Sequence, residues 1–429
     1  EDMQTAASHM IEQRDKLPSR AKRDEVLEIV RASQCVVICG ETGCGKTTQV
    51  PQYLLDDRIS RGSGSTTCIV CTQPRRLAAV SVAQRVAQER CQTLGDQVGY
   101  QIRLENKMSE RTRLLYCTNG ILLRKMQSNA AVPNISHIIV DEIHERSLDS
   151  DFLLIVLRDL IRTRPDIKVV LMSATVNAEM FSRYFNDCPI INIPGFTHPV
   201  EIFYLEDVIT RLDYVIDADS EYAKAGAGTA GAGANASKGK PASKSSKPGI
   251  HQKEAAEHSH RTAKMQKMAA SFPEHPESTW RTLLMLDQEK LNYELMEHLV
   301  LYLDEEYCDV EGAVLVFLPG LQEIQKLFDE LESNSCISRG NRFVVYPLHS
   351  SFSTASQQAI FKRPPRGTRK IVLATNIAET SITIDDVVFV IDAGKLKENR
   401  YDPVNQMPQL METWISQASA RQRKGRAGR

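Results

Sequence analysis

The residues best suited to chemistry form the run Gly40-Glu41-Thr42-Gly43-Cys44-Gly45-Lys46-Thr47. The run matches the pattern G-x-x-x-x-G-K-[ST] and stands between a β-branched run and a helical pattern, as a phosphate-binding loop requires. Glycines let backbone N–H groups turn toward a phosphate, and the following helix N-terminus adds positive charge. We expect Lys46 at the β- and γ-phosphates and the Thr47 hydroxyl on Mg²⁺. The predicted nucleotide-binding positions here are Gly40, Glu41, Thr42, Gly43, Cys44, Gly45, Lys46, Thr47 and Thr48.

Two carboxylates, Asp141 and Glu142, follow the apolar run 137–140. A strand there would deliver both to its C-terminal end, where ligands bind in open α/β sheets. We expect both at the metal, with Asp141 ordering Mg²⁺ and Glu142 deprotonating the attacking water. A strand that simply ends in an acidic loop is the alternative, and it does not explain the phosphate loop upstream.

The final residues, 422–429, supply a glutamine and spaced arginines. Arg426 and Arg429 are three apart and can face one γ-phosphate if a second domain closes against the first. Guanidinium groups stay charged and bind phosphate with two donors. A nucleic-acid-binding patch is the alternative, but the phosphate loop favours arginine fingers.

Positioning these groups requires a parallel sheet. The chain has 429 residues, enough for about two to four domains. Short β-branched runs alternate with helical patterns, which predicts α/β domains with mostly parallel sheets and helices on both faces. We expect strands at 35–39, 68–72, 114–117, 137–140, 169–172 and 190–193, and in a second domain at 313–318, 343–348, 370–374 and 387–391. We expect helices at 49–57, 77–89, 121–127, 151–161, 178–185, 291–303, 321–331 and 354–361.

Composition divides the chain. Residues 223–236 are almost all Ala and Gly, and 238–247 mix Lys, Ser and Pro, which is typical of a flexible insert. Its basic residues could touch RNA, although a solvated linker is the simpler interpretation. We predict an N-terminal extension at 1–17, a first domain at 18–206, an insert at 207–277 and a second domain at 278–429. The chain ends inside a basic run, so we expect that last domain to be incomplete.

Several classes are excluded. No run of about 18 apolar residues occurs, so we expect no membrane contact, and residues 1–16 lack the apolar stretch of a signal peptide. Cys68 and Cys71 form a C-x-x-C, but in a strand they would point to opposite faces. We therefore expect reduced core thiols and no structural zinc. The net charge of −1 leaves local basic stripes as the only signature for nucleic acid.

Taken in order, the motifs resemble those of the DEAH-box RNA helicases of superfamily 2. Asp141-Glu142-Ile143-His144 resembles the family signature. Other matches are Thr72 to Arg76 (motif Ia), Thr118 to Gly120 (Ib), Ser173-Ala174-Thr175 (III), Phe317 to Gly320 (IV), Ala374 to Ser381 (V) and Gln422 to Arg429 (VI). Residues 399–413 resemble a family β-hairpin thought to part the duplex. The resemblance implies two RecA-like domains with ATP between them and RNA crossing both.

It also implies roles for single residues. Gln422 would position water beside the fingers Arg426 and Arg429, Arg85 would stack on the base, and Asp385 would lie near the ribose. Where many members have an aromatic residue after Asp-x-Gly, this chain has Lys395, so we expect poor discrimination between ATP and other NTPs. Ser173, Ala174 and Thr175 would couple the two sites. The implied RNA-backbone contacts are Arg75, Arg76, Thr118, His349, Ser350, Thr375 and Asn376.

The resemblance thus implies an RNA-stimulated NTPase with Mg²⁺ that moves 3′ to 5′ on RNA and remodels duplexes or ribonucleoproteins. A nucleotide-gated RNA clamp without processive unwinding is the alternative, and a DNA helicase is a third. The chain is similar to the larger multidomain DEAH helicases of the cytoplasm, which have winged-helix, ratchet and OB-like domains after motif VI. We therefore expect a cytoplasmic protein, with the nucleus as the alternative, and ribonucleoprotein or ribosomal partners.

Overall fold

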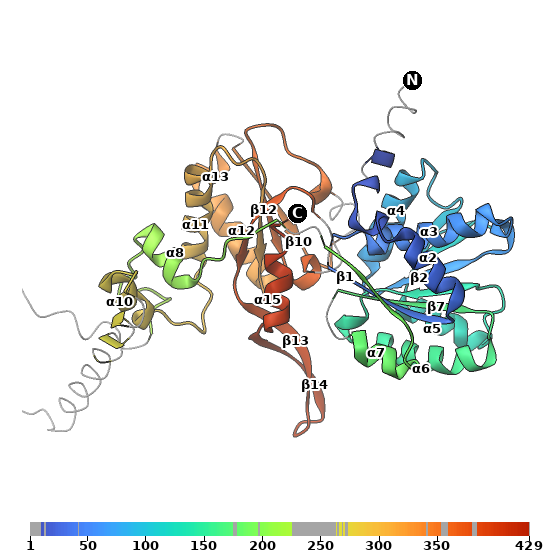
Figure 1. Ribbon diagram of the computed structural model, residues 1–429. Helices are drawn as coiled ribbons and strands as arrows, with labels where there is room; N and C mark the ends of the chain where they lie inside the picture. Colours follow the sequence, from blue (N-terminus) through green and yellow to red (C-terminus); the bar gives the residue numbers. More distant parts are fainter. Residues whose placement is uncertain are drawn as a thin grey trace, which may run out of the picture.

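The first half of the chain folds around an eight-stranded, mostly parallel sheet. The computed structural model describes residues 10–12, 14–41, 43–174, 178–195, 198–224, 263, 266–267, 269–270, 273–339, 342–352, 359–379 and 384–428 (Figure 1). The strand order is β4-β3-β5-β2-β6-β7-β1-β8, and only the β3–β4 pair is antiparallel. The strands are β1 Cys35–Gly40, β2 Ile69–Gln73, β3 Val98–Ile102, β4 Glu105–Lys107, β5 Leu114–Thr118, β6 His137–Val140, β7 Lys168–Ser173 and β8 Ile190–Ile193.

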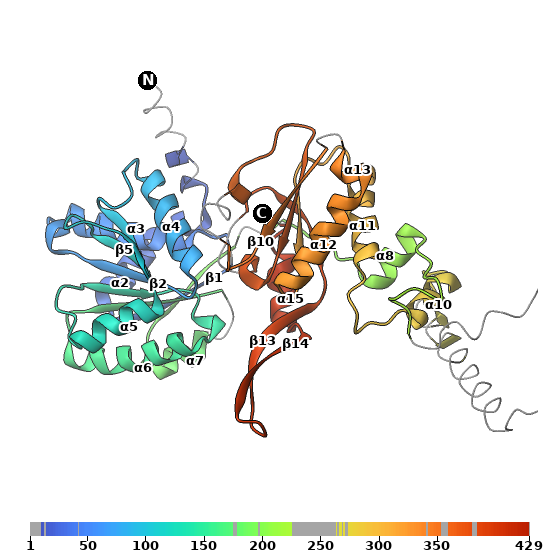
Figure 2. The same cartoon turned by 180° about the vertical axis from the view of Figure 1, so that it is seen from behind.

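Helices cover both faces of this sheet, as predicted. Because successive side chains of a strand point to opposite faces, Val36 and Ile38 pack into one apolar cluster and Val37 and Cys39 into the other. The first cluster lies under α2 Arg23–Ala32, α3 Lys46–Ser60 and α4 Arg76–Glu89. The second lies under α5 Asn119–Ser128, α6 Leu148–Thr163 and α7 Ala178–Tyr184 (Figures 1 and 2).

The six predicted strands of this sheet are confirmed to within one residue at each end. The β3–β4 hairpin and α2 were not predicted. The β3 strand contains Gly99, which interrupts its run of strand-forming residues, and the backbone of Lys107 lies where a side chain at this position would be. Of the two cysteines of the C-x-x-C, Cys71 is buried, whereas Cys68 precedes β2 and is half-buried. Cys35 and Cys39 of β1 are buried as well.

The second sheet has four parallel strands in the order β10-β11-β9-β12. They are β9 Ala313–Phe317, β10 Phe343–Leu348, β11 Arg369–Ala374 and β12 Val387–Asp392. The helices α11 Tyr293–Glu306 and α12 Leu321–Ser333 cover one face, followed by α13 Ser335–Ser338 and, near the end of the chain, α15 Gln417–Lys424. Leu77 of α4 packs into the cluster on the other face, so the first domain covers part of the core of the second. This fold class, two α/β domains with mostly parallel sheets, is the predicted one.

Two predictions for this domain were less accurate. The first helix was predicted to begin at residue 291. Asn292 caps α11 by accepting a hydrogen bond from the Leu295 N–H at 2.9 Å, so the helix begins at Tyr293. Of the helix predicted at 354–361, residues 354–358 lie outside the described part, and the rest forms a short 3₁₀ turn, Ala359–Phe361.

The predicted flexible insert begins too early. The boundary at 206/207 falls inside α8 Leu205–Leu212, which packs beside α10 Glu277–Met285 and α11 (Figures 1 and 2). Ile209, Tyr214 and Ala223 are buried with Trp280 in one apolar cluster. Residues 207–224 therefore belong to the folded second domain, because their apolar side chains find a partner surface that is distant in sequence. Residues 225–262 lie outside the described part.

The predicted hairpin is confirmed. Strands β13 Lys395–Asp402 and β14 Met407–Trp414 pair antiparallel, with Asp402 opposite Met407 at the tip. The hairpin projects from the second domain (Figure 1), and Tyr401, Leu410 and Trp414 on it are exposed. Among the described helices, none is both long and apolar enough to cross a bilayer.

The chain's two tryptophans test the corrected boundary. Trp280 is 2% exposed, so Trp280→Ala should lower the free energy of unfolding by about 3–5 kcal/mol. Trp414 is 55% exposed, and Trp414→Ala should cost about 1 kcal/mol or less. Urea unfolding of both variants measures the difference. Equal small losses would show that the α8–α10 cluster contributes nothing to the domain.

Candidate active site

The predicted phosphate-site residues meet because their strands are neighbours. The loop follows β1, Asp141 follows β6, and Ser173 ends β7, and these three strands lie side by side in the order β6-β7-β1. Parallel strands end at the same edge of a sheet, so groups from three distant parts of the chain come together there.

The backbone of the loop explains its glycines. Gly43 and Gly45 have φ of 88° and 89°, a left-handed conformation that side chains with a Cβ rarely adopt. A Cβ on Gly45 would also lie 2.7 Å from Oγ of Ser19, whose N–H donates to the Cys44 carbonyl at 3.0 Å. Lys46 opens α3 and is buried. Thr42 lies outside the described residues.

Asp141 joins three segments. Its Oδ2 accepts hydrogen bonds from the Thr47 hydroxyl at 2.6 Å and from Nε2 of Gln73 at 2.9 Å. Its Oδ1 accepts from the Glu142 N–H at 2.8 Å. The side chain is fully buried. Gln73 was not predicted as a site residue; its place at the end of the neighbouring strand β2 was the available signal.

Glu142 has the properties of a general base. It is 6% exposed, and its Oε2 receives no hydrogen bond from the described residues. Burial, partly offset by the positive charge of Lys46 and reinforced by the negative charge of Asp141, raises its pKa from 4.5 to about 7. Its backbone is left-handed, with φ of 54°, a conformation that costs a residue with a Cβ about 1–3 kcal/mol. The fold thus holds a carboxyl group with a raised pKa in a strained, buried position.

His144 links this site to two other predicted elements. Its Nδ1 accepts from the Ala174 N–H at 3.3 Å and lies 3.4 Å from Oε2 of Glu142. Its Nε2 lies 3.1 Å from the side-chain amide of Gln422, in the second domain. Burial lowers the pKa of His144, so the ring is neutral at pH 7. Ser173 is buried at the end of β7, and Thr175 lies outside the described residues.

The arginines of 422–429 divide into two kinds. Arg426 is 3% exposed, donates through Nη2 to the Glu379 carbonyl, and is close enough to lower the pKa of Glu142. Arg429 lies outside the described residues. Arg423 was not predicted as important, yet it is 1% exposed and pairs with Glu379 at 3.0 Å and Asp392 at 2.7 Å. Arg423 therefore anchors α15, while Arg426 faces the first domain.

The predicted RNA contacts gather in the same way. Arg75 and Arg76 follow strand β2, and Thr118 is the last residue of the neighbouring strand β5, opposite Gln73. In the second domain, His349 and Ser350 follow β10, and Thr375 and Asn376 follow its neighbour β11. Arg75 spans the two groups, because its Nη1 donates to the Asn376 carbonyl at 2.8 Å. Arg76 and Ser350 are exposed, whereas Thr375 is buried. Burial lowers the pKa of His349.

The residues predicted at the base and at the ribose come from different domains. Arg85 lies on α4 and bonds Glu89 at 2.8 Å, and Asp385 is exposed in the turn before β12. Lys395 does not project toward them: it is buried beside Glu412 at 3.0 Å and over the Trp414 ring. The place of the aromatic residue found in many family members is thus occupied by a lysine that stabilises the base of the hairpin.

Glu142 should make stability depend on pH in a defined window. Its pKa in the folded chain, about 7, exceeds its ordinary 4.5, so the folded state holds a proton that the unfolded chain releases. Its contribution to stability is present below pH 4.5, falls as pH rises, and is lost above pH 7. Glu142→Gln should therefore unfold at a higher temperature than the parent at pH 8, and the gain should vanish near pH 4.5. Thermal unfolding without nucleotide or divalent cation measures this; a gain independent of pH would contradict it.

Arg423→Met tests the anchor of α15. Because it leaves Glu379 and Asp392 without their cation, it should lower the free energy of unfolding by about 3–5 kcal/mol. Arg421→Met on the same helix removes an exposed guanidinium and should change stability by about 0.5 kcal/mol or less. Urea unfolding of both variants measures the two free energies of unfolding. An equal loss in both would contradict the role of Arg423 as the anchor of α15.

Comparisons with known proteins agree with this geometry. Residues 20–182 match the DEAD/DEAH box helicase domain, and residues 295–429 match the helicase conserved C-terminal domain. The chain is 47% identical to human DHX57 and 47% identical to the Xenopus laevis ATP-dependent RNA helicase dhx29, covering 98% of this chain and 31% of each relative. It is 46% identical to the Bos taurus ATP-dependent DNA/RNA helicase DHX36, covering 97% of this chain and 40% of that protein.

The chain thus spans about a third of the length of relatives to which nearly all of it is similar. Both helicase domains are matched, and the site that joins them is assembled from the motifs of one family. The chain therefore belongs to the DEAH-box RNA helicases.

Proposed function

We propose that this chain is the motor core of an ATP-dependent RNA helicase. RNA would stimulate NTP hydrolysis, and hydrolysis would drive 3′ to 5′ movement and the remodelling of duplexes or ribonucleoproteins. The observation that carries the proposal is the meeting of Lys46, Asp141 and Glu142 from the first domain with Gln422 and Arg426 from the second.

The chemistry assigned to these residues follows from their surroundings. Lys46 and the loop backbone bind the phosphates, and Glu142 accepts a proton from the attacking water. A pKa near 7 suits that task, because a base works best when its pKa is close to the working pH. Arg426 compensates the charge that develops on the γ-phosphate, once its guanidinium leaves the Glu379 carbonyl, and Gln422 positions the water. Arg429 is assigned the same role as Arg426 by resemblance alone.

Mg²⁺ fits the oxygen donors of this site. The Thr47 hydroxyl lies 2.6 Å from the Asp141 carboxylate, and Glu142 has a carboxylate oxygen that no described group hydrogen-bonds. Hydroxyl and carboxylate oxygens are ligands that Mg²⁺ prefers. Thr47 and Asp141 would hold the ion, with Glu142 nearby, and the ion would offset the charge of the phosphates.

RNA binding is assigned to the second group of strand ends. Arginines, hydroxyls and amides bind phosphate and sugar without reading sequence, as a translocase requires. Arg75 already contacts the Asn376 carbonyl and lies 3.6 Å from Glu145. A phosphate taken up by Arg75 would compete with both contacts, and Glu145 is three residues from Glu142. RNA would thereby influence the hydrolytic site through a short, partly buried path.

ATP turnover with and without single-stranded RNA tests the proposal directly. RNA should raise kcat of the parent chain, and Glu142→Gln should lower kcat by about 10³-fold or more because the general base is removed. ATP binding, measured by calorimetry, should persist in the variant. Near-parental turnover by Glu142→Gln would overturn the base assignment.

The choice between RNA and DNA and the movement along the strand need separate experiments. DNA of the same sequence distinguishes an RNA enzyme from one that accepts both, as the name of the bovine relative indicates for that protein, since a 2′-OH contact responds to RNA only. A duplex with a 3′ overhang tests movement. RNA-stimulated turnover without strand release would favour the nucleotide-gated clamp.

A further inference from the structure

A cluster of buried polar side chains lies beside the phosphate loop. Glu89, the last residue of α4, has a side chain only 2% exposed. Its Oε2 accepts from Nε2 of Gln49 and from Nε2 of Gln52, each at 2.8 Å. Its Oε1 accepts from Nε of Arg85 at 2.8 Å. One carboxylate therefore fixes two side chains of α3 and one arginine of its own helix.

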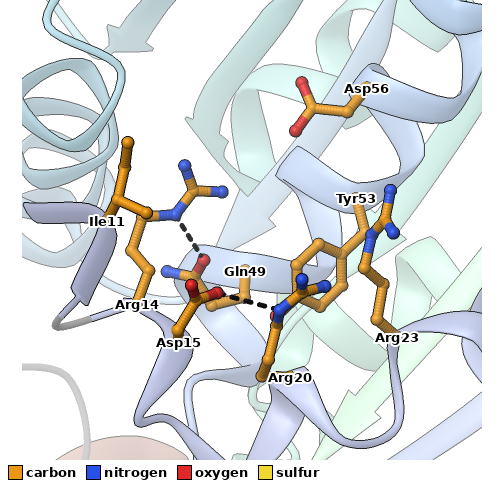
Figure 3. A pocket seen from close by; sticks show the side chains of 8 residues that line it. All are labelled: Ile11, Arg14, Asp15, Arg20, Arg23, Gln49, Tyr53 and Asp56. Atoms are coloured by element: carbon orange, nitrogen blue, oxygen red, sulfur yellow. Dashed lines mark hydrogen bonds and ion pairs between the residues drawn. The ribbon is translucent and has the colours of Figure 1, made fainter. Parts of the chain in front are cut away.

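The cluster is continuous with the loop and with the N-terminal segment. Nε2 of Gln49 lies 3.0 Å from the Thr48 hydroxyl. On its other side, Oε1 of Gln49 accepts from Nε of Arg14 at 3.0 Å, at the wall of a pocket of about 240 Å³ (Figure 3). Arg14 itself lies 3.9 Å from Glu89. Glu89 is thus the common partner of the loop helix, the N-terminal segment and Arg85.

Arg85 differs from the other members of the cluster. Its side chain is 41% exposed, although its Nε is held by a buried carboxylate. A long exposed arginine normally samples many rotamers, and ordering it opposes binding. The charge-assisted bond to Glu89 reduces that freedom before a ligand arrives. A guanidinium held in this way can stack on a planar ring with little further ordering.

We propose that Glu89 is a positioning residue that holds Arg85 for stacking on the base of a bound nucleoside triphosphate. The inference rests on the proposed function, which places the phosphates in the loop and the base at Arg85. According to this inference, Glu89 strengthens binding of the base and does not affect binding of the phosphates. Because Lys395 is buried elsewhere, base binding then depends mainly on how well Arg85 is held.

The test compares the parent with Glu89→Gln, Arg85→Ala and the double variant. KM for ATP, kcat, and inhibition by inorganic tripolyphosphate, which has no base, are measured in the presence of RNA. Glu89→Gln should raise KM for ATP about fivefold to tenfold, as expected for a lost charge-assisted bond. It should leave kcat and the tripolyphosphate inhibition constant within about twofold. In the Arg85→Ala background it should raise KM no further, because the two residues act as one unit.

Asp56→Asn is the matched control. Asp56 of α3 accepts from Nη1 of Arg90, the residue after α4, at 2.8 Å. Among the described residues no hydrogen bond joins Asp56 to Arg85, so KM should stay unchanged. If Glu89→Gln does not fold, Glu89→Asp keeps the charge on a shorter side chain and should raise KM by a smaller factor. The proposal would be overturned if Glu89→Gln raised KM by the same factor with and without Arg85→Ala. It would also be overturned if Glu89→Gln weakened tripolyphosphate binding as much as ATP binding.

Calorimetric ATP binding separates this inference from the proposed function. If the parent chain binds ATP without hydrolysing it, the proposed function is wrong. The parent, the two single variants and the double variant would then be compared by their Kd for ATP. A tighter Kd for the parent than for Glu89→Gln, with no difference once Arg85 is Ala, would still support the role of Glu89. Equal Kd values for parent and Glu89→Gln would overturn it.

Discussion

The carboxylate of Asp141 is the interaction on which the nucleotide site depends. It receives hydrogen bonds from Thr47, Gln73 and the Glu142 backbone, so three chain segments are fixed by two oxygen atoms. A fully buried carboxylate is costly unless it is well hydrogen-bonded, and this one is satisfied by donors from three directions. The arrangement leaves Glu142 held by its backbone, while its own carboxylate keeps an oxygen that no described group bonds.

A second buried network performs the same task in the other domain. Arg423 is fixed by Glu379 and Asp392 and lies over the Phe317 ring. Arg426 lies three residues after Arg423, just after the end of α15. Because Arg423 fixes this end of the helix, the Arg426 guanidinium is held at the domain boundary. Truncating one partner of such a network leaves buried charge uncompensated, so the network specifies the geometry of α15 as much as it stabilises it.

Among the residues that the structure describes, few polar contacts join the two domains, and each involves a residue from one of the family's motifs. His144 meets Gln422, Arg75 meets the Asn376 carbonyl, and the His198 N–H donates to the Gly428 carbonyl at 3.2 Å. Leu77 adds an apolar contact two residues beyond Arg75. Contacts of this kind are exchanged more easily than a large apolar interface. In the function proposed above, nucleotide at one end and RNA at the other would bias the same boundary, which is how two ligands become coupled.

The sequence by itself determined most of the strands, the phosphate loop and the order of the motifs, because these depend on local patterns of apolar, glycine and charged residues. The strands β6 and β10 were predicted to the residue for this reason, since each is a run rich in apolar residues with polar residues around it. Only the tertiary structure decided which side chains the buried charges meet. Neither the pairing of Arg423 with Glu379 nor that of Glu89 with Gln49 and Gln52 follows any local pattern, because their partners come from distant segments. The same reason explains the error at 207, where Ile209 and Tyr214 are core residues only because Trp280, some seventy positions later, covers them.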